Sequence, residues 1–352
     1  MALIISVPDT LRKSVEAASG GKVTVMYTAK GQASYMAVIP KFTLESIDAS
    51  LGTGTHPMFV VGGVEKSYRY IGMYPGTIKN GELLSLPGET PAHSANFDSF
   101  VATARANGAG WGLMTNVDWA GIGQRAWKSG TQPRGNTDYG RSSDLPAERG
   151  VDAATGLLAA ATGTATNHTR TGSGPASWRD DNTPFGIADL CGNVWEWAPG
   201  LRIVDAEVQI IANNNATLTA TDFGVASAAW QAIDGATGTL VAPGAAGTVK
   251  YASSGTADYT IVTSGTFSSL TNPGVTPASL AALQVLRQHG AYPVATTDMG
   301  NDGFWIALAG ERLPFRGGVW NSGASAGVFA LALSNARSFA YSDIGARCAF
   351  VS

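Results

Sequence analysis

Charge is scarce in this sequence of 352 residues. Asp, Glu, Lys and Arg together make up 14% of it, whereas about 25% is usual for soluble domains. The 23 basic and 26 acidic residues leave a formal net charge of -3, so no positive field is available to attract phosphate groups. We therefore expect no nucleic-acid partner.

Long hydrophobic runs and cysteines are also few. The longest apolar stretches, such as residues 58–63 and 328–333, are far shorter than the roughly 18 residues that a membrane helix needs, so no membrane insertion is expected. The apolar residues 1–8 contain no basic residue, which argues against a signal peptide. Two cysteines, Cys191 and Cys348, exclude a disulfide framework but leave open one bridge or two buried thiols.

What the sequence has is glycine and an ordinary hydrophobic content. It contains 44 glycines, and 44% of its residues are hydrophobic, which is enough for a large core and excludes global disorder. Two β-prone runs, 23–27 and 36–40, flank a turn at 30–32 and predict a hairpin. Residues 59–63 and 68–71 repeat this pattern and predict a second one.

Two helices are predicted after these strands. Apolar residues at 97, 100, 101 and 104 follow helical spacing between Asn96 and Gly108. The pair Thr115 and Asp118 forms a T-x-x-D cap for a second helix, which Gly130 would end. Helices that follow a group of strands are typical of an α+β fold.

The remaining chain divides by composition. Residues 132–183 are rich in Gly, Pro, Ser, Thr, Asn and Asp and predict a long irregular loop. Residues 201–300 are poor in charge and rich in Ala, Gly and Thr, and we interpret them as an insertion or subdomain packed on the main core, with a helix from Thr276 to Gly290. Residues 1–39 form a β-rich arm or the start of the fold, 40–200 its first part and 301–352 its C-terminal part.

Three motifs are more specific. They are G-N-V-W-E-W at 192–197, R-G-G-x-W at 316–320 and I-G-x-R-x-A at 344–349. Together they resemble the formylglycine-generating-enzyme type of C-type lectin fold, which implies this subtype for residues 40–352. Gly192, Gly317 and Gly318 would allow close backbone approaches. Trp195 and Trp197, two residues apart, would share one strand face in the core.

The catalytic residues of that family are missing here. Its oxidases need a cysteine pair that would fall near Ser322 and Gly327, and neither is cysteine. Related iron enzymes need clustered histidines, whereas His56, His93, His168 and His289 are scattered along the sequence. We therefore expect no enzyme, and keep a metal-dependent oxidase or oxygenase as an alternative.

The family often binds calcium. Asn193 and Glu196 carry oxygens of a suitable type, but two ligands are too few for a site. Calcium therefore remains a candidate ligand, and no cofactor is required.

The C-terminal segment from Arg316 resembles the variable region of proteins diversified by retroelements, the family of the phage major tropism determinant. In that family asparagine codons of a template are copied with errors at adenines. Eight residues stand where the template pattern has asparagine, and each can arise from AAC by changing one or both adenines; two positions keep asparagine. In chain order these ten candidate ligand-binding positions are Val319, Asn321, Ser322, Ser325, Ala332, Ser334, Asn335, Phe339, Tyr341 and Asp343. Ala346 departs from the pattern in a way that adenine errors do not explain.

This resemblance implies a ligand-binding variable protein, a phage or prophage tail component that recognises a host-surface protein or glycan. Its expected location is the virion, or it is directed to the bacterial cell surface. Other virion or tail subunits would be partners, and assembly into a homo-oligomer is left open. A structural virion protein is the second alternative. The varied side chains should face solvent, with Phe339 and Tyr341 as an aromatic patch beside Asp343. Five residues should face inward: Trp320, Val328, Phe329, Leu331 and Leu333. The run 328–333 alone is typical of an ordinary buried strand.

Overall fold

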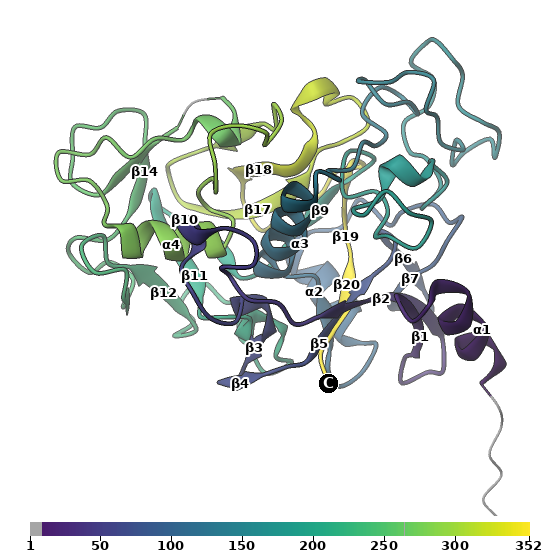
Figure 1. Cartoon of the computed structure of the whole chain (residues 1–352), viewed down its shortest axis with the longest axis horizontal. Coiled ribbons are helices and arrows are strands. Elements are labelled where there is room, and N and C mark those ends of the chain that lie inside the picture. The colour runs from purple at the N-terminus through teal and green to yellow at the C-terminus, as the bar shows by residue number, and fades with distance from the viewer. Residues whose placement is uncertain (1–8, 264) are drawn as a thin grey trace, which may run out of the picture.

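The structure, a computed structural model, describes residues 9–263 and 265–352, and this part of the chain forms a mixed α+β fold (Figure 1). The predicted fold class is therefore confirmed at this level. The helices of the described residues are α1 (Thr10–Ser19), α2 (Phe97–Arg105), α3 (Asn116–Ser129) and α4 (Leu280–Gln288).

Two large sheets carry the fold. The first has the strand order β1 (Val23–Tyr27), β2 (Ala33–Pro40), β5 (Tyr68–Gly72), β20 (Cys348–Phe350) and β8 (Trp111–Leu113). The main path of the second is β13 (Leu240–Val241), β12 (Trp230–Ile233), β11 (Glu207–Ile211), β10 (Leu201–Val204), β17 (Glu311–Gly317), β18 (Gly327–Asn335) and β16 (Phe304–Ile306). Strands β14 (Lys250–Ala252), β15 (Thr260–Val262), β9 (Trp195–Trp197) and β19 (Ile344–Ala346) join it beside this path. Two small hairpins pair β3 (Val60–Val61) with β4 (Val64–Glu65), and β6 (Gly76–Lys79) with β7 (Glu82–Ser85).

The three sequence motifs meet on adjacent strands. Strand β9 carries W-E-W and pairs with β17, which leads into R-G-G, on one side and with β19 of I-G-x-R-x-A on the other. Between β19 and β20 lies Arg347, whose guanidinium forms a buried bidentate ion pair with Glu196 at 2.7 and 3.0 Å. A Cβ at Gly192 or Gly318 would overlap neighbouring backbone, so both glycines are needed for these close approaches.

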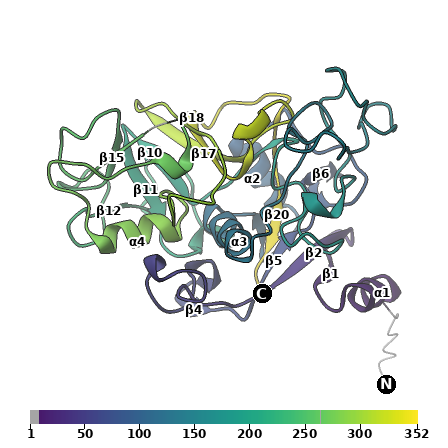
Figure 2. The same ribbon diagram turned by 45° about the horizontal axis from the view of Figure 1, so that its top comes forward.

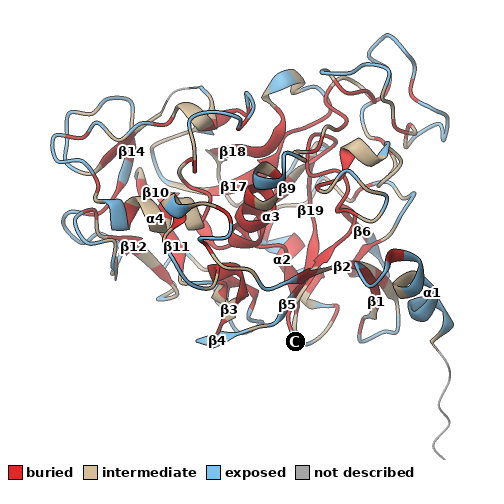
Figure 3. Cartoon of the chain, in the orientation of Figure 1, coloured by how far each residue is buried: buried red, intermediate tan, exposed pale blue. Residues whose placement is uncertain are grey.

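The helices follow their predicted signals. Asn96 caps α2, and Thr115 with Asp118 forms a reciprocal capping box on α3. Helix α3 packs against β18, and Figure 3 shows buried residues gathered in α3, β17, β18 and β5, while the outer loops are exposed. Residues 132–183 are irregular as predicted, with one 3-10 turn at Ala176–Trp178 as their helical element.

Residues 201–300 are built into the second sheet. Strand β10 pairs with β17 as well as with β11, and α4 packs on α3. Figure 2 shows this green segment on one side of α3 and the loops of 132–183 on the other. Apolar residues of the segment share one core cluster with α3 and β18, as expected of a segment packed on the main core, whereas its predicted boundaries remain a prediction.

Two expectations about local structure are wrong. The runs 59–63 and 68–71 do not pair, because Gly62 and Gly63, both at positive φ, make the turn of the β3–β4 hairpin, and β5 joins β2 and β20 instead. The helix predicted from Thr276 begins at Leu280, where the Ser279 hydroxyl accepts the Ala282 amide. The N-terminal arm contains α1, capped by Asp9, while residues 1–8 lie outside the described part.

Buried histidines give the fold a specific pH dependence. His56 is fully buried, and its Nδ1 accepts the Met58 amide. Burial lowers the pKa of His56 to about 3 and that of His289 to about 4. In the unfolded chain the pKa values of His56 and His289 are both near 6.5. As the pH falls, the unfolded chain is therefore protonated before the folded one. The stability that the two neutral, buried histidines contribute above pH 6.5 is lost as the pH falls below that value.

We therefore predict that the stability difference between the wild type and His56→Gln shrinks by about 1.4 kcal/mol per pH unit below pH 6.5. Urea unfolding of both proteins from pH 7.5 to 4.5 measures it. The comparison is needed because burial raises the pKa of Asp180 to about 6 and of Asp302 to about 7, which acts in the opposite sense in both proteins. Parallel stability curves would contradict the prediction.

Candidate ligand-binding pocket

A pocket of about 390 Å³ opens on the C-terminal part of the second sheet, within the range of roughly 300–1,000 Å³ usual for small-molecule sites. Strands β9, β16, β17, β18 and β19 and the segments after Trp320 and Asn335 supply its walls. Its lining residues are Trp195, Trp305, Phe315, Asn321, Ser322, Ala332, Ser334, Asn335, Phe339, Asp343 and Ile344.

The hollow exists because a small residue lies between two large ones. In the register of three neighbouring strands, Trp305 of β16 stands beside Ala332 of β18, and Phe315 of β17 stands on the other side. Directly paired residues project from the same sheet face. The methyl group of Ala332 leaves the space between the two aromatic rings unfilled.

Aromatic rings form the walls. Trp195 and Trp305 meet almost at a right angle, with ring centroids 5.3 Å apart and planes at 89°. Phe315 lies 6.3 Å from the ring of Trp195 and 6.3 Å from that of Phe339. Phe339 in turn stacks on Tyr341 at 6.4 Å. These rings make a continuous aromatic surface from β16 to the segment after Asn335.

Asp343 is the one charged residue among those that line the pocket. Its Oδ1 atom is buried and accepts no hydrogen bond within the described chain. Burial raises the pKa of this carboxyl, while a hydrogen bond from its own backbone amide acts against the rise. A buried acceptor without a partner is costly and rare, so Asp343 is an unusual residue in the pocket wall.

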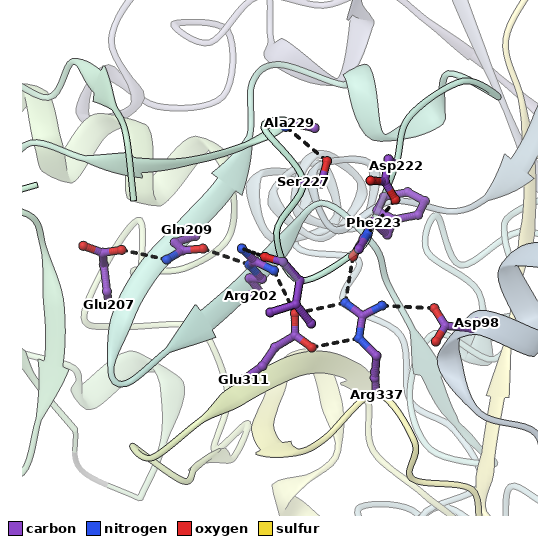
Figure 4. Close-up of polar contacts among 12 residues, drawn as sticks. Asp98, Arg202, Glu207, Gln209, Asp222, Phe223, Ser227, Ala229, Glu311 and Arg337 are labelled. Carbon is purple, nitrogen blue, oxygen red and sulfur yellow. Dashed lines mark hydrogen bonds and ion pairs between the residues drawn. The ribbon is translucent and has the colours of Figure 1, made fainter. Parts of the chain in front are cut away.

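An ion network holds the base of the segment that carries Phe339 and Asp343 (Figure 4). Both nitrogens of one edge of Arg337 bind the Glu311 carboxylate, at 2.8 and 2.9 Å. Glu311 also accepts from Arg202 at 2.8 Å, and Arg337 reaches Asp98 of α2 and the Phe223 carbonyl. Burial alone would raise the pKa of Glu311, but the two arginines outweigh it and hold the pKa below its usual value.

Seven of the ten predicted positions line this one pocket: Asn321, Ser322, Ala332, Ser334, Asn335, Phe339 and Asp343. Tyr341 lies next to it through its stack on Phe339. Ser325 lies outside it, near the end of a 3-10 turn. The five residues predicted to face inward, Trp320, Val328, Phe329, Leu331 and Leu333, are all buried.

The expectation that every varied side chain faces solvent is wrong at two positions. Val319 is 6% exposed because the long loop covers its segment, with Tyr139 donating to the Trp320 carbonyl and Gly323 to that of Thr137. Ala332 is buried within a strand that has partners on both sides, although it lines the pocket.

Two histidines that are distant in the sequence come together. The rings of His93 and His168 stack at 4.8 Å, and His168 also packs edge-on against Trp320 at 4.5 Å. His168 donates from Nε2 to the Ser342 carbonyl, next to Asp343. His93 and His168 are thus neighbours in space although they are far apart in the sequence. Within the described residues no group of three or more His, Cys, Asp or Glu side chains is arranged to hold a metal ion.

The other candidate residues have protein partners or are isolated. Cys191 and Cys348 are buried free thiols, so the single bridge left open by the sequence is absent. Glu196 binds Arg347 with both oxygens, and the Asn193 amide oxygen accepts from Thr169. Calcium binding stays a prediction, but Asn193 and Glu196 do not support it, because these oxygens already have protein partners.

Four lining residues were not predicted as site residues: Trp195, Trp305, Phe315 and Ile344. Trp195 was assigned to the core, yet it lines the pocket, and Trp305 belongs to no motif. A tryptophan in a short run of aromatic and apolar residues at 304–306 is the available signal, but its position depends on the parallel pairing of β16 with β18, which sequence spacing does not indicate.

Comparisons with known proteins give no assignment. Neither a scan against protein-family models nor a search of curated proteins found a match for this chain. Among the described helices none has the length and apolar character that a bilayer crossing requires.

We predict that Ala332→Leu fills the pocket at a cost of less than about 1.5 kcal/mol, because the added atoms enter empty space. Ala330→Leu is the matched control: Ala330 lies two residues earlier on β18, is fully buried and does not line the pocket, so it should cost about 1–3 kcal/mol or more. Urea unfolding of both variants measures the two costs. Equal costs would show that the pocket is not open space.

We also predict that Glu311→Gln lowers stability by about 2 kcal/mol, since it leaves Arg202, 3% exposed, without its carboxylate partner. The loss should be smaller than the 3–5 kcal/mol of fully buried pairs because Glu311 is 12% exposed. Glu65→Gln, which removes the exposed partner of Lys41, should change stability by less than about 1 kcal/mol. Chemical denaturation of the three proteins tests the difference.

Proposed function

We propose that this chain is a ligand-binding variable protein with a C-type lectin fold of the formylglycine-generating-enzyme subtype. Its role would be recognition without turnover, as a phage or prophage tail component that binds a host-surface protein or glycan. One observation carries the proposal: seven of the ten positions selected only because the template pattern has asparagine there line one pocket.

The surroundings of the pocket support this proposal. The three motifs supply three adjacent strands beneath it, joined by the buried pair of Glu196 and Arg347. Recognition surfaces that tolerate many side chains need such a fixed scaffold. Aromatic side chains such as Phe339 and Tyr341 are the type that contributes most at binding surfaces.

The direct test is the gene's neighbourhood. A diversified protein should have a reverse-transcriptase gene nearby and a near-copy of its last coding segment that differs at adenines. The copy should carry asparagine codons at the substituted positions. If the gene's neighbourhood contains no such copy, diversification by a retroelement is refuted. The pocket itself does not depend on this result.

A matched pair of substitutions tests the separation of scaffold and surface in the protein. Phe315→Ala should cost about 3–5 kcal/mol because large core residues leave cavities, and this ring is 1% exposed. Phe339→Ala should cost about 1 kcal/mol or less, because its ring is 39% exposed. Urea unfolding measures both. Equal losses would mean that Phe339 belongs to the core.

The same surface distinguishes recognition from a structural role. Phe339→Ala combined with Tyr341→Ala should weaken attachment to host cells if the surface binds a host molecule. Particle assembly should be unaffected. If assembly fails and attachment by assembled particles is unchanged, the pocket face packs on a neighbouring subunit, and the structural alternative replaces the proposal.

A further inference from the structure

The chemistry of the pocket identifies a ligand class, and this step rests on the proposed recognition function. We infer that the pocket binds an alkylated ammonium group, held among the rings of Trp195, Trp305, Phe315 and Phe339, with Asp343 as its counter-charge. The group would belong to a small quaternary ammonium compound or to the side chain of a lysine.

The ring arrangement is the first argument. The faces of aromatic rings are electron-rich and attract cations within about 6 Å of the ring centroid, most strongly at tryptophan. Here Trp195 and Trp305 stand at 89° to each other, 5.3 Å apart, so one ring is edge-on to the other, and the attraction for a cation has to come from ring faces because ring edges are electron-poor. Phe315 and Phe339 continue this wall on the other side of Ala332.

The charge balance is the second argument. No basic residue lines the pocket, and Asp343 is its sole carboxylate. Arg337 and Arg202, at the base of the segment that carries Phe339 and Asp343, are both paired with Glu311. An anionic ligand would therefore meet an unpaired carboxylate and no cation, whereas a cation would neutralise Asp343.

The unpartnered Oδ1 of Asp343 is the third argument. Asp343 lines the pocket, and its Oδ1, although covered from solvent, has no hydrogen-bond donor within the described chain. The remaining polar lining comes from the hydroxyls and amides of Asn321, Ser322, Ser334 and Asn335, which can accept from or donate to the rest of a ligand. Asp343 is therefore the lining residue that would favour a positively charged ligand over a neutral one.

Ala332 sets the room for the ligand. The paired neighbours Trp305 and Phe315 are held apart by one strand, and only a methyl group occupies the position between them. A larger residue at 332 would occupy the place of the alkylated head. The same substitution, Ala332→Leu, therefore serves as a steric block that leaves Asp343 and the rings present.

The experiment compares choline with its neutral carbon isostere, 3,3-dimethylbutan-1-ol, by isothermal titration calorimetry on the full chain. The two have nearly the same shape, so a difference measures charge. We expect choline to bind at least about tenfold more tightly, because cation–π attraction to the lining rings and the charge of the Asp343 carboxylate both favour the cation over the neutral alcohol. Equal binding of the two, or no detectable choline binding, would overturn the inference.

Variants locate the site. Asp343→Asn should weaken choline binding at least about fivefold and leave the alcohol unaffected, and Ala332→Leu should weaken both. Glu65→Gln, which removes a carboxylate remote from the pocket lining, should change neither. A thermal unfolding midpoint for each variant shows that it is folded. Choline binding that Asp343→Asn and Ala332→Leu leave unchanged would overturn the inference.

A further titration with Nα-acetyl-lysine amide and its Nε-trimethylated form distinguishes the two sources of the ammonium group. Tighter binding of a lysine compound than of choline assigns the site to a protein ligand, and the reverse order assigns it to a small quaternary ammonium compound. The gene-neighbourhood test is independent of these titrations. A template copy without choline binding would reject the ligand class alone, and choline binding without a copy would reject diversification alone.

Discussion

The ion pair between Glu196 and Arg347 is the interaction on which the arrangement of the two sheets depends. Arg347 lies where the chain leaves β19 of the second sheet and enters β20 of the first. Its guanidinium also donates to the carbonyls of Gly72 and Ala188, so both sheets and the segment before β9 meet at one buried cation. A buried charge is tolerated only when its donors are satisfied in this way. The pair therefore ties β9, which carries the pocket residue Trp195, to the first sheet.

Local signals in the sequence predicted local structure well. The hairpin of β1 and β2, the cap at Asn96 and the capping box at Thr115 depend on residues a few positions apart, and all three are confirmed. Features that depend on distant pairing were missed. Strand β5 joins the first sheet instead of a neighbouring hairpin, because Gly62 and Gly63 already form the turn.

The candidate site shows the same limit. That the ligand-binding positions lie after Arg316 stays a prediction from the resemblance, although seven of those ten positions line the pocket. The depth of the pocket was not predictable, because the hollow results from Ala332 lying between Trp305 and Phe315 on three different strands. The burial of Val319 was missed for a related reason: the loop that covers it, around Tyr139, has no periodic pattern from which its path can be predicted.

The anchoring of Arg337 has a consequence for binding kinetics. Glu311, Asp98 and the Phe223 carbonyl hold this residue at the start of the segment that carries Phe339 and Asp343. Ordering of the segment is thus completed when the chain folds and adds no entropy cost when a ligand arrives. Under the proposed recognition function, different ligands would then be met at similar rates, and exchange of side chains beyond Arg337 would act mainly on how long a complex lasts.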